Sequence, residues 1–472
     1  MANRMPLISV YITNYNYGKF IKQSIESLLN QTLQDFEVFI IDDGSTDDSR
    51  KTIEEYAELP QISIIYQRNK GLNITNNIAL RVARGKYIMR LDADDYLVPD
   101  ALETMSRVLE SDSELGLVFP DYYLVDVNGV PIGEVRRFNF KNEVSLLDQP
   151  AHGACTMIRR DFLLNLGGYD ESYSCQDGYE LWIKFISHYK VLNINKPLFS
   201  YRQHGSNLTS NENRILSTRF AIKDNFIANN NIITPTTLAV IPVRNSYLKD
   251  KNIPLLDLGG ETLLQRISKI ACSSQKLHKV VLTSAEENIK QYYYEHLSAL
   301  SEKLLFVERP AEFARINESL VETINFILGQ ETAINCDVEA VMTLAIEYPF
   351  ISRQMIDDAI NTLTIFGADT ILSVRPDNSI YYQHDGNGLH PILDLDKFTK
   401  LEREALYKGV GGIVLTKTNG IKREKKMLNG KVGHIVVDER SALSIASEFQ
   451  LDIIQNIINS RGSEIKKVSV NS

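Results

Sequence analysis

Short apolar runs alternate with segments of helical period along the N-terminal part of the chain. The runs that predict strands span residues 7–13, 36–41, 62–66 and 87–91. Helices are predicted over residues 21–29, over residues 73–84 and again after Pro99. Because strands that alternate with helices form a mostly parallel sheet with both faces covered, this half of the chain is predicted to be α/β.

A second series of the same kind begins after a segment that has no regular period. Residues 224–237, DNFIANNNIITPTT, are rich in Asn and Thr and predict a boundary. Strand-like runs follow at residues 238–243, 279–284 and 340–345. We therefore expect two nucleotide-binding, Rossmann-like α/β domains in tandem, over residues 1–228 and 237–465.

Polar clusters follow three of the predicted strands. TNYNYG follows the first strand, DDGSTDD follows the second, and DADD follows the strand that ends at Leu91. In a parallel sheet the loops and helix N-termini converge at the carboxyl ends of the strands, where ligands bind. We expect these three loops to line one binding crevice.

Three carboxylates, those of Asp92, Asp94 and Asp95, come directly after a strand that is predicted to be buried. Carboxylates this close repel one another unless a cation or hydrogen-bond donors compensate their charge. Magnesium and manganese ions take oxygen ligands and leave positions for phosphates, so the predicted cofactor is Mn²⁺ or Mg²⁺. Helix capping is the alternative, both for this turn and for the turn that holds Asp42 and Asp43.

Composition narrows the choice of partners. Hydrophobic residues make up 43% of the chain and charged residues 24%, which argues against disorder or a coiled coil. The formal net charge of -9 gives no electrostatic reason to bind nucleic acid. No run of about 18 apolar residues occurs, so we expect a cytoplasmic protein, and contact with the inner face of the cell membrane stays open.

Five sequence blocks between residues 6 and 208 carry a resemblance to a known family. In chain order they are SVYITNYNYGKFIKQSIESLLNQT, IIDDGSTDDS, GLNITNNIALRVARGKYIMRLDADD, GGYDE and QDGYELW. Their order and spacing closely resemble family 2 glycosyltransferases, which have the GT-A fold. The resemblance implies an enzyme that moves a sugar from a nucleoside diphosphate to an acceptor hydroxyl with inversion of configuration.

The same resemblance assigns roles on the donor side. Thr13 and Tyr15 would line the nucleotide pocket, and Asp43 would hydrogen-bond the base, which in this family is usually uracil. Asp92 would contact the donor ribose or sugar, and Asp94 would ligate the metal. A UDP-sugar is therefore the favoured donor, and a cell-envelope glycan or glycoconjugate is the expected acceptor.

On the acceptor side, Asp177 matches the family's catalytic base, which removes the proton from the attacking hydroxyl. The family often has Glu before this Asp, whereas this chain has Gln176. His204 sits where many members place a histidine that contacts metal or phosphate, so it is predicted as a second metal ligand. A histidine on a surface loop is the alternative.

Three further residues have functional and structural interpretations. Arg202 would steady a phosphate, or it is a plain surface arginine. His152 would lie near the acceptor, or it is a buried structural histidine. Trp182, the only tryptophan, is expected to pack in the core beside Leu181 and Phe185.

The second half of the chain resembles, more weakly, the cytidylyltransferases that activate acidic sugars as CMP derivatives. The matching pieces are AVIPVR at 239–244, KNIPLLDLGGETLLQRI at 251–267, RPAEFA at 309–314 and EYPFIS at 347–352. By this resemblance Arg244, Lys251 and Asn252 would be nucleotide-contacting remnants.

Departures from the cytidylyltransferase pattern fall where its chemistry would be. NSYLKD replaces the family's Gly-Ser-Lys phosphate loop and contains no glycine. Ser444 and Ala446 stand where that family has metal-binding aspartates. We expect a catalytically degenerate domain kept for dimerisation, docking or regulation, with KREKKM at 422–427 as a solvated loop.

Two other functions remain open at this point. Because Arg244 and Lys251 survive, the chain could be bifunctional and make a CMP-sugar as well as transfer a sugar. A non-catalytic scaffold that binds nucleotide sugars and recruits other envelope-polysaccharide enzymes is the second alternative. A homodimer through the C-terminal domain is compatible with each of them.

Overall fold

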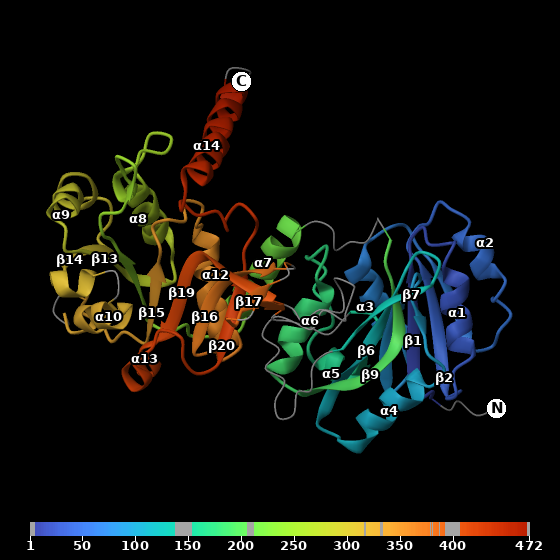
Figure 1. The fold of residues 1–472 in the computed structure, drawn as a ribbon. Coiled ribbons are helices and arrows are strands. Elements are labelled where there is room, and N and C mark those ends of the chain that lie inside the picture. Colours follow the sequence, from blue (N-terminus) through green and yellow to red (C-terminus); the bar gives the residue numbers. More distant parts are fainter. Residues whose placement is uncertain are drawn as a thin grey trace. The chain divides into compact units, whose positions relative to one another are not determined.

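The computed structural model describes residues 5–136, 153–204, 212–315, 318–330, 334–377, 379, 381–386, 388–391 and 406–469. The chain divides into two compact units (Figure 1). Unit 1 comprises residues 1–219 and 379–404, and unit 2 comprises residues 220–378 and 405–472. Each unit has its own sheet with helices around it, which confirms the predicted α/β class with two domains.

The main sheet of unit 1 has the strand order β3-β2-β1-β4-β8-β6-β9-β5, and β7 pairs with β6. β1 to β4 are parallel, as predicted, whereas β8 joins β4 to β6 in antiparallel fashion. The strands are β1 (Ile8–Asn14), β2 (Phe36–Asp42), β3 (Ile62–Tyr66), β4 (Tyr87–Asp92), β5 (Tyr96–Leu97), β6 (Leu115–Val125), β7 (Pro131–Val135), β8 (Met157–Arg159) and β9 (Lys190–Arg202). The helices are α1 (Ile21–Leu29), α2 (Ser49–Glu54), α3 (Leu72–Val82), α4 (Ala101–Ser111), α5 (Arg160–Asn165) and α6 (Asp177–Ile186).

The central position of β1 follows from its apolar residues. Ile8, Val10 and Ile12 alternate along the strand and are fully buried. They share a core cluster with Ile21 and Ile25, which lie one helical turn apart on α1. Burial of these side chains between sheet and helix is the main favourable contribution to the stability of this region.

The register of β1 decides which polar side chains meet at the edge of the sheet. Thr13 stands opposite Asp92 of β4, and Asn14 stands opposite Asp42 of β2. Because the three strands run in the same direction, the loops that follow them leave from one edge. The predicted convergence of the three polar loops is therefore observed.

The main sheet of unit 2 has the strand order β14-β13-β10-β15-β19-β16-β20. Its strands are β10 (Thr237–Pro242), β13 (Leu277–Ser284), β14 (Leu304–Glu308), β15 (Ala340–Leu344), β16 (Thr370–Asp377), β19 (Leu406–Lys417) and β20 (Val432–Val436). A short hairpin of unit 2 pairs β11 (Tyr247–Leu248) with β12 (Lys251–Asn252). A second hairpin, which belongs to unit 1, pairs β17 (Tyr382–His384) with β18 (Leu389–Pro391). The helices are α8 (Leu263–Ser273), α9 (Glu287–Tyr292), α10 (Leu320–Leu328), α12 (Arg353–Ile365), α13 (Thr418–Glu424) and α14 (Glu448–Ser469). Across the described ranges, no helix is both long enough and apolar enough to cross a membrane.

Helix α7 (Glu212–Asn229) extends through residues 224–229, for which the sequence pattern predicted irregular structure. The prediction of irregular structure was wrong. It relied on apolar periodicity, and this helix shows little of it. Only Ile222, Lys223 and Ile227 of this helix are buried, so its apolar stripe is too thin to be read from the sequence.

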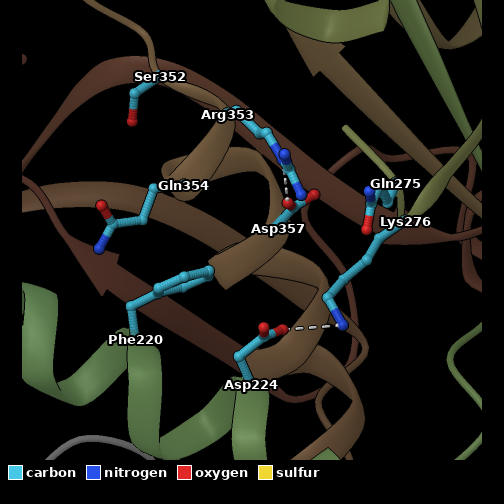
Figure 2. Close-up of a pocket in the computed structure, with 8 residues that line it drawn as sticks. All are labelled: Phe220, Asp224, Gln275, Lys276, Ser352, Arg353, Gln354 and Asp357. Atoms are coloured by element: carbon cyan, nitrogen blue, oxygen red, sulfur yellow. Dashed lines mark hydrogen bonds and ion pairs between the residues drawn. The ribbon is translucent and has the colours of Figure 1, made fainter. Parts of the chain in front are cut away.

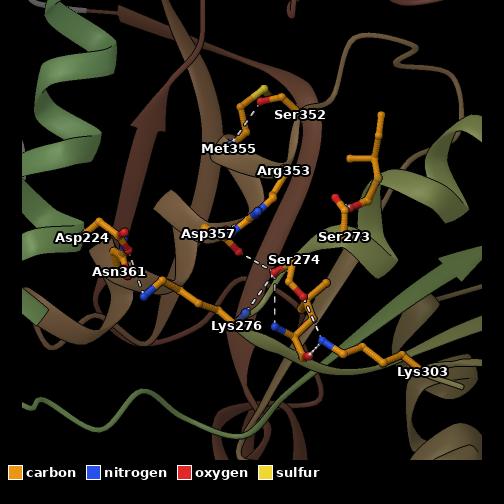
Figure 3. A network of polar contacts seen from close by, with 12 residues as sticks. Asp224, Ser273, Ser274, Lys276, Lys303, Ser352, Arg353, Met355, Asp357 and Asn361 are labelled. Carbon is orange, nitrogen blue, oxygen red and sulfur yellow. Dashed lines mark hydrogen bonds and ion pairs between the residues drawn. The ribbon is translucent and has the colours of Figure 1, made fainter. Parts of the chain in front are cut away.

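Polar contacts within unit 2 fasten α7 to α12 and to the segment before β13 (Figure 3). Asp224 of α7 accepts a hydrogen bond of 3.1 Å from Asn361 of α12. Its carboxylate also pairs with Lys276 at 3.0 Å. The hydroxyl of Ser274 donates to Asp357 of α12, so this helix is held at two places.

Candidate active site

Side-chain hydrogen bonds tie the loop after β1 to the loop after β2. Asn14 donates to the hydroxyl oxygen of Ser45 at 3.0 Å, and the backbone N–H of Asn16 donates to the same oxygen at 2.9 Å. The side-chain oxygen of Asn16 accepts from the N–H of Thr46 at 2.7 Å. Asn16 has a φ of 61°, a left-handed conformation that Asn adopts more readily than most residues. The two loops therefore form one rim.

Asp43 closes the loop that follows β3. Its Oδ1 accepts hydrogen bonds from the N–H of Lys70 at 2.8 Å and from the side chain of Gln67 at 2.7 Å. Its Oδ2 accepts from the N–H of Gly71 at 2.9 Å. A carboxylate offers about four acceptor positions, so three protein bonds leave room for one more donor. The expected contact with a nucleotide base stays a prediction.

Thr13 and Asp92 are joined at the end of β1 and β4. The hydroxyl of Thr13 donates to Oδ1 of Asp92 at 3.1 Å. The same carboxylate oxygen lies 2.9 Å from Nε of Arg90. Tyr15 lies just beyond β1 and is 46% exposed, so its ring is accessible to a ligand.

Asp177 reaches the same edge from a distant part of the chain. It is the first residue of α6 and follows Gln176, which has a φ of 63°. Oδ2 of Asp177 accepts a hydrogen bond from Nη1 of Arg90 and a longer one, of 3.4 Å, from the amide of Asn76. Arg90 therefore pairs with both Asp177 and Asp92. Burial opposes the charge of Arg90, but Asp177 and Asp92 raise its pKa well above the ordinary value.

Asp94 and His204 form a second pair at this edge. Nε2 of His204 lies 2.8 Å from Oδ2 of Asp94, and each side chain is about one-tenth exposed. The rings of Tyr17 and Phe20 pack against the imidazole, with centroids 5.5 and 5.8 Å away. His204 is thus a packed residue, and the surface-loop interpretation was wrong.

Negative charge near this pair is only partly compensated. Oδ1 of the buried Asp95 accepts from the backbone N–H of Arg202 at 2.9 Å, but Oδ2 has no hydrogen-bond partner within the described residues. Burial, with the charges of Asp94 and Asp92, raises the pKa of Asp95 well above its ordinary value. Burial and Asp92 also raise the pKa of Asp94. A divalent cation beside Asp94 would relieve this repulsion, so the residues fit the predicted Mn²⁺ or Mg²⁺.

Helix capping does not account for the Asp-rich turn after β4. The next helix, α4, begins at Ala101 after Asp100, and β5 lies between it and the turn. The carboxylates of Asp94 and Asp95 point instead to His204 and Arg202. In the part of the chain that the structure describes, no three His, Cys, Asp or Glu side chains are grouped to hold a metal.

Comparison with known proteins shows the family to which the chain belongs. The model of glycosyl transferase family 2 matches residues 9–167. Over 212 residues the chain is 32% identical to an uncharacterized glycosyltransferase of Methanocaldococcus jannaschii, and the match covers 42% of this chain and 71% of that protein. The chain belongs to glycosyl transferase family 2.

Two named relatives of this family 2 chain are much longer proteins. It is 36% identical over 206 residues to a chondroitin synthase of Escherichia coli. The match covers 43% of this chain and 30% of the synthase. It is 33% identical over 207 residues to a hyaluronan synthase of Pasteurella multocida. That match covers 43% of this chain and 21% of the enzyme. The chain thus spans less than a third of either synthase.

Two glycosyltransferases are among the solved structures with partial similarity to this chain. TarS of S. aureus, in complex with UDP-GlcNAc, has a TM-score of 0.38 and 17% identity, with 47% of this chain and 65% of that one covered. The mannosyltransferase PcManGT of Pyrobaculum calidifontis, in complex with GDP-Man and Mn²⁺, has a TM-score of 0.39 and 18% identity, with 48% and 65% covered.

Some side chains in this family 2 chain differ from their predicted roles. Arg202 is buried, and its guanidinium donates to Gln23 and to backbone carbonyls of Asp94 and Val127, so it is neither a surface arginine nor open to phosphate. Trp182 is buried against Phe119, as expected for core packing. His152 lies outside the described residues.

Sequence reasoning missed the residues that surround Asp177. Arg90 stands in the middle of the buried strand β4, between Met89 and Leu91, and a charged residue at such a position was the available signal. Asn76 on α3 and Tyr11 on β1 gave no signal, because both residue types are common in ordinary structure. Tyr11 donates to the side-chain oxygen of Asn76 at 3.2 Å and so turns the Asn76 amide toward Asp177.

In unit 2, some of the residues that match the cytidylyltransferase pattern lie near the end of β10. Arg244 lies two residues beyond this strand, and Arg309 is close enough that burial and Arg244 together lower its pKa. Asn252 of β12 donates to Asn245 at 2.7 Å. The family 2 match ends before this unit, so the cytidylyltransferase-like assignment stays a prediction. The KREKKM segment is exposed from residue 422 to 426, but residues up to Glu424 belong to α13 and not to a loop.

A cavity of about 560 Å³ lies in unit 2 and contains none of the predicted site residues (Figure 2). Its charged side chains are paired with each other, Lys276 with Asp224 at 3.0 Å and Arg353 with Asp357 at 3.2 Å. Figure 2 shows both pairs on the same side of Phe220, with Arg353 and Asp357 above Asp224 and Lys276. The cavity is lined by Phe220, Asp224, Gln275, Lys276, Ser352, Arg353, Gln354 and Asp357. The carboxylate-rich edge of unit 1, and not this cavity, holds the candidate chemistry.

Proposed function

We propose that unit 1 is an inverting, metal-dependent glycosyltransferase. It would move a sugar from a nucleoside diphosphate donor, with a UDP-sugar favoured, to a hydroxyl of a cell-envelope glycan or glycoconjugate. One observation carries the proposal. Asp177, Asp92 and the pair of Asp94 with His204 come from separate parts of the chain and meet at one sheet edge. Buried ionisable groups gathered in this way are typical of functional sites.

Asp177 would act as the base. The acceptor hydroxyl gives its proton to Asp177 while its oxygen attacks the anomeric carbon from the side opposite the diphosphate. The bond from that carbon to the diphosphate oxygen breaks, the diphosphate leaves, and the configuration inverts. Oδ2 of Asp177 is held by Arg90 and Asn76, so Oδ1 is the oxygen left to receive the proton.

Residues at the ends of β1, β2 and β4 would bind the donor. Thr13 and Tyr15 would line the nucleoside pocket, and the fourth acceptor position of Asp43 would take an N–H of the base, which uracil offers. Asp92, oriented by the Thr13 hydroxyl, would bind a hydroxyl of the ribose or sugar. The two glycan synthases among the relatives support a glycan acceptor.

Asp94 and His204 would hold Mn²⁺ or Mg²⁺, and diphosphate oxygens and water would complete the coordination. When bound, such a cation would neutralise charge on the departing diphosphate. The protein's own contribution is to bury and align the two ligands. His204 packs against Tyr17 and Phe20, so its ring is already oriented.

The proposal is tested with the full chain and a panel of UDP-, dTDP-, GDP- and CMP-sugars, with and without Mn²⁺. Asp177→Ala should abolish transfer while the donor still binds, and Asp94→Ala should abolish transfer and weaken donor binding. Asp161→Asn, which changes an exposed carboxylate, is the matched control and should keep full activity. Near-normal turnover in both site variants would refute the assignment.

For unit 2 we propose a docking or dimerisation role without nucleotidyl transfer. Ser444 and Ala446 replace the expected metal-binding carboxylates, and Asn252 is occupied by Asn245. The bifunctional alternative rests on Arg244 and Lys251, and a second arginine, Arg309, lies close to Arg244 near β10. Release of pyrophosphate from CTP in the presence of an acidic sugar would establish that alternative.

A further inference from the structure

Arg90 sits where the donor side and the acceptor side of the proposed site meet. Its side chain is 5% exposed. Nε lies 2.9 Å from Oδ1 of Asp92, and Nη1 donates to Oδ2 of Asp177. A guanidinium is planar and rigid, so one group that contacts two carboxylates fixes the spacing between them.

We infer that Arg90 is a positioning residue for sugar transfer, which holds the carboxylate of Asp177 at a fixed spacing from the carboxylate of Asp92. The inference rests on the proposed function, in which Asp92 faces the donor and Asp177 faces the acceptor. Because its side chain is almost fully buried, Arg90 would act through the two carboxylates and not on a substrate directly. It acts by placing the proton acceptor at the correct distance from the bound donor, and small errors in such placement cost rate.

The two carboxylates depend on Arg90 to different degrees. Asp92 keeps a second support, because the Thr13 hydroxyl donates to it at 3.1 Å. Among the side chains that the structure describes, only Asn76 also donates to Asp177, through a long hydrogen bond of 3.4 Å. Loss of Arg90 should therefore disturb Asp177 more than Asp92, and lower kcat more than it weakens donor binding.

Gly153 offers an independent way to move the Arg90 side chain. A Cβ at this position would lie 2.6 Å from Nη2 of Arg90 and 3.2 Å from Oδ2 of Asp177. The φ of Gly153 is not in the left-handed region, so the close approach of the side chains, and not the backbone, is what requires glycine. Gly153→Ala should displace the guanidinium without removing any charge.

The test compares Arg90→Ala, Arg90→Lys and Gly153→Ala in the full chain, with the donor found active in the panel. We expect kcat of Arg90→Ala to fall about 100-fold, the lower end of what a positioned base contributes, with donor KM changed less than about threefold. Added methylguanidinium should restore part of kcat in Arg90→Ala. Arg90→Lys should be intermediate, because an ammonium is a point charge that cannot span both carboxylates. Gly153→Ala should lower kcat about tenfold, as expected for a misplaced base.

Arg159→Ala is the matched control for damage to the fold. Arg159 is a partly buried arginine of β8 that donates to the backbone carbonyls of Leu115 and Leu109. The Arg159→Ala variant should have a lower melting temperature with little change in kcat, and added methylguanidinium should not alter this kcat. Parental kcat in both Arg90→Ala and Gly153→Ala would overturn the inference. If Asp177→Ala also kept its activity, the proposed function itself would fall.

Discussion

The imidazole of His204 lies 2.8 Å from the carboxylate of Asp94, although 110 positions separate the two residues in the chain. Arg202, at the end of β9, explains how they meet. Its backbone N–H donates to Asp95 at 2.9 Å, and its Nε donates to the carbonyl of Asp94 at 2.8 Å. The end of β9 is thus fastened to the Asp-rich turn, and His204 is held beside Asp94 by contacts within the protein.

Replacement of His204 by Ala should weaken binding of Mn²⁺ by about tenfold or more, since loss of even an outer-shell partner of a metal ligand costs that much. The measurement is a calorimetric titration with Mn²⁺ in the presence of UDP. His188→Ala, which removes an exposed histidine at the end of α6, should leave the titration unchanged. An unaltered affinity for Mn²⁺ in His204→Ala would exclude this residue as a ligand.

Asp43→Asn should both destabilise unit 1 and weaken UDP binding. The carboxylate accepts hydrogen bonds from the backbone N–H groups of Lys70 and Gly71 and from Gln67. An amide group directs N–H toward one of these donors, so at least one buried bond is lost, at a cost of about 1–3 kcal/mol. Chemical denaturation measures the first effect and UDP titration the second. Parental stability would mean that Asp43 does not hold the loop.

Tyr11→Phe should lower kcat a few-fold with a small change in stability, of about 1 kcal/mol. Without the hydroxyl, nothing from Tyr11 orients the amide of Asn76 toward Asp177. Burial raises the pKa of Tyr11 well above its ordinary value, so its hydroxyl remains a donor at every working pH. Tyr66→Phe, which removes an exposed hydroxyl that donates to Glu54, is the control for steady-state kinetics. Equal kcat in the two variants would contradict the proposed orientation.

Glu180 should make the stability of the protein fall as the pH rises. Burial raises its pKa above the ordinary 4.5, although Lys184 opposes the shift. The folded protein therefore binds this proton more tightly than the unfolded chain. The resulting stabilisation is complete below about pH 4.5 and is lost as the pH rises through the raised pKa.

Melting temperatures of the parent and of Glu180→Gln, measured between pH 4.5 and 8, check this expectation. The neutral variant should gain stability relative to the parent as the pH rises. Lys184 keeps its hydrogen bond to the carbonyl of Gly168 in either protein, so it is not left without an acceptor. The control Glu55→Gln, at an exposed position, should give a curve of melting temperature against pH that is parallel to that of the parent. A parallel curve for Glu180→Gln as well would show that burial of the Glu180 carboxyl does not make stability depend on pH.

The meeting of Thr13 with Asp92 at one sheet edge could be predicted from the sequence because it depends on local order. Thr13 and Asp92 end two apolar runs that form neighbouring parallel strands, so the pattern of strands alone brings them to one edge. The pairing of Asp177 with Arg90 could not be predicted in this way. It joins residues 87 positions apart through the packing of α6, and the strand pattern carries no information on that contact.

Helix α7 was missed for a different physical reason. Its sequence is polar on most sides, and Ile222 and Ile227 supply nearly all of its buried apolar surface. Such a helix is stabilised by tertiary polar contacts, including that of Asp224 with Lys276, and has little periodic signal of its own. Patterns of apolar residues locate helices that cover a core, and they overlook helices that are held by ion pairs.

The guanidinium of Arg90, which pairs with two carboxylates, also limits how the sugar specificity of the proposed enzyme could be redesigned. In the proposed function Asp177 faces the acceptor and Asp92 faces the donor. A substitution that moves Asp177 to suit a new sugar would also move the guanidinium of Arg90 and, through it, Asp92. Engineering of one subsite would therefore carry an unintended change into the other. Variants with a new acceptor preference are best sought by altering the surrounding loops, with this arginine and its two acids left in place.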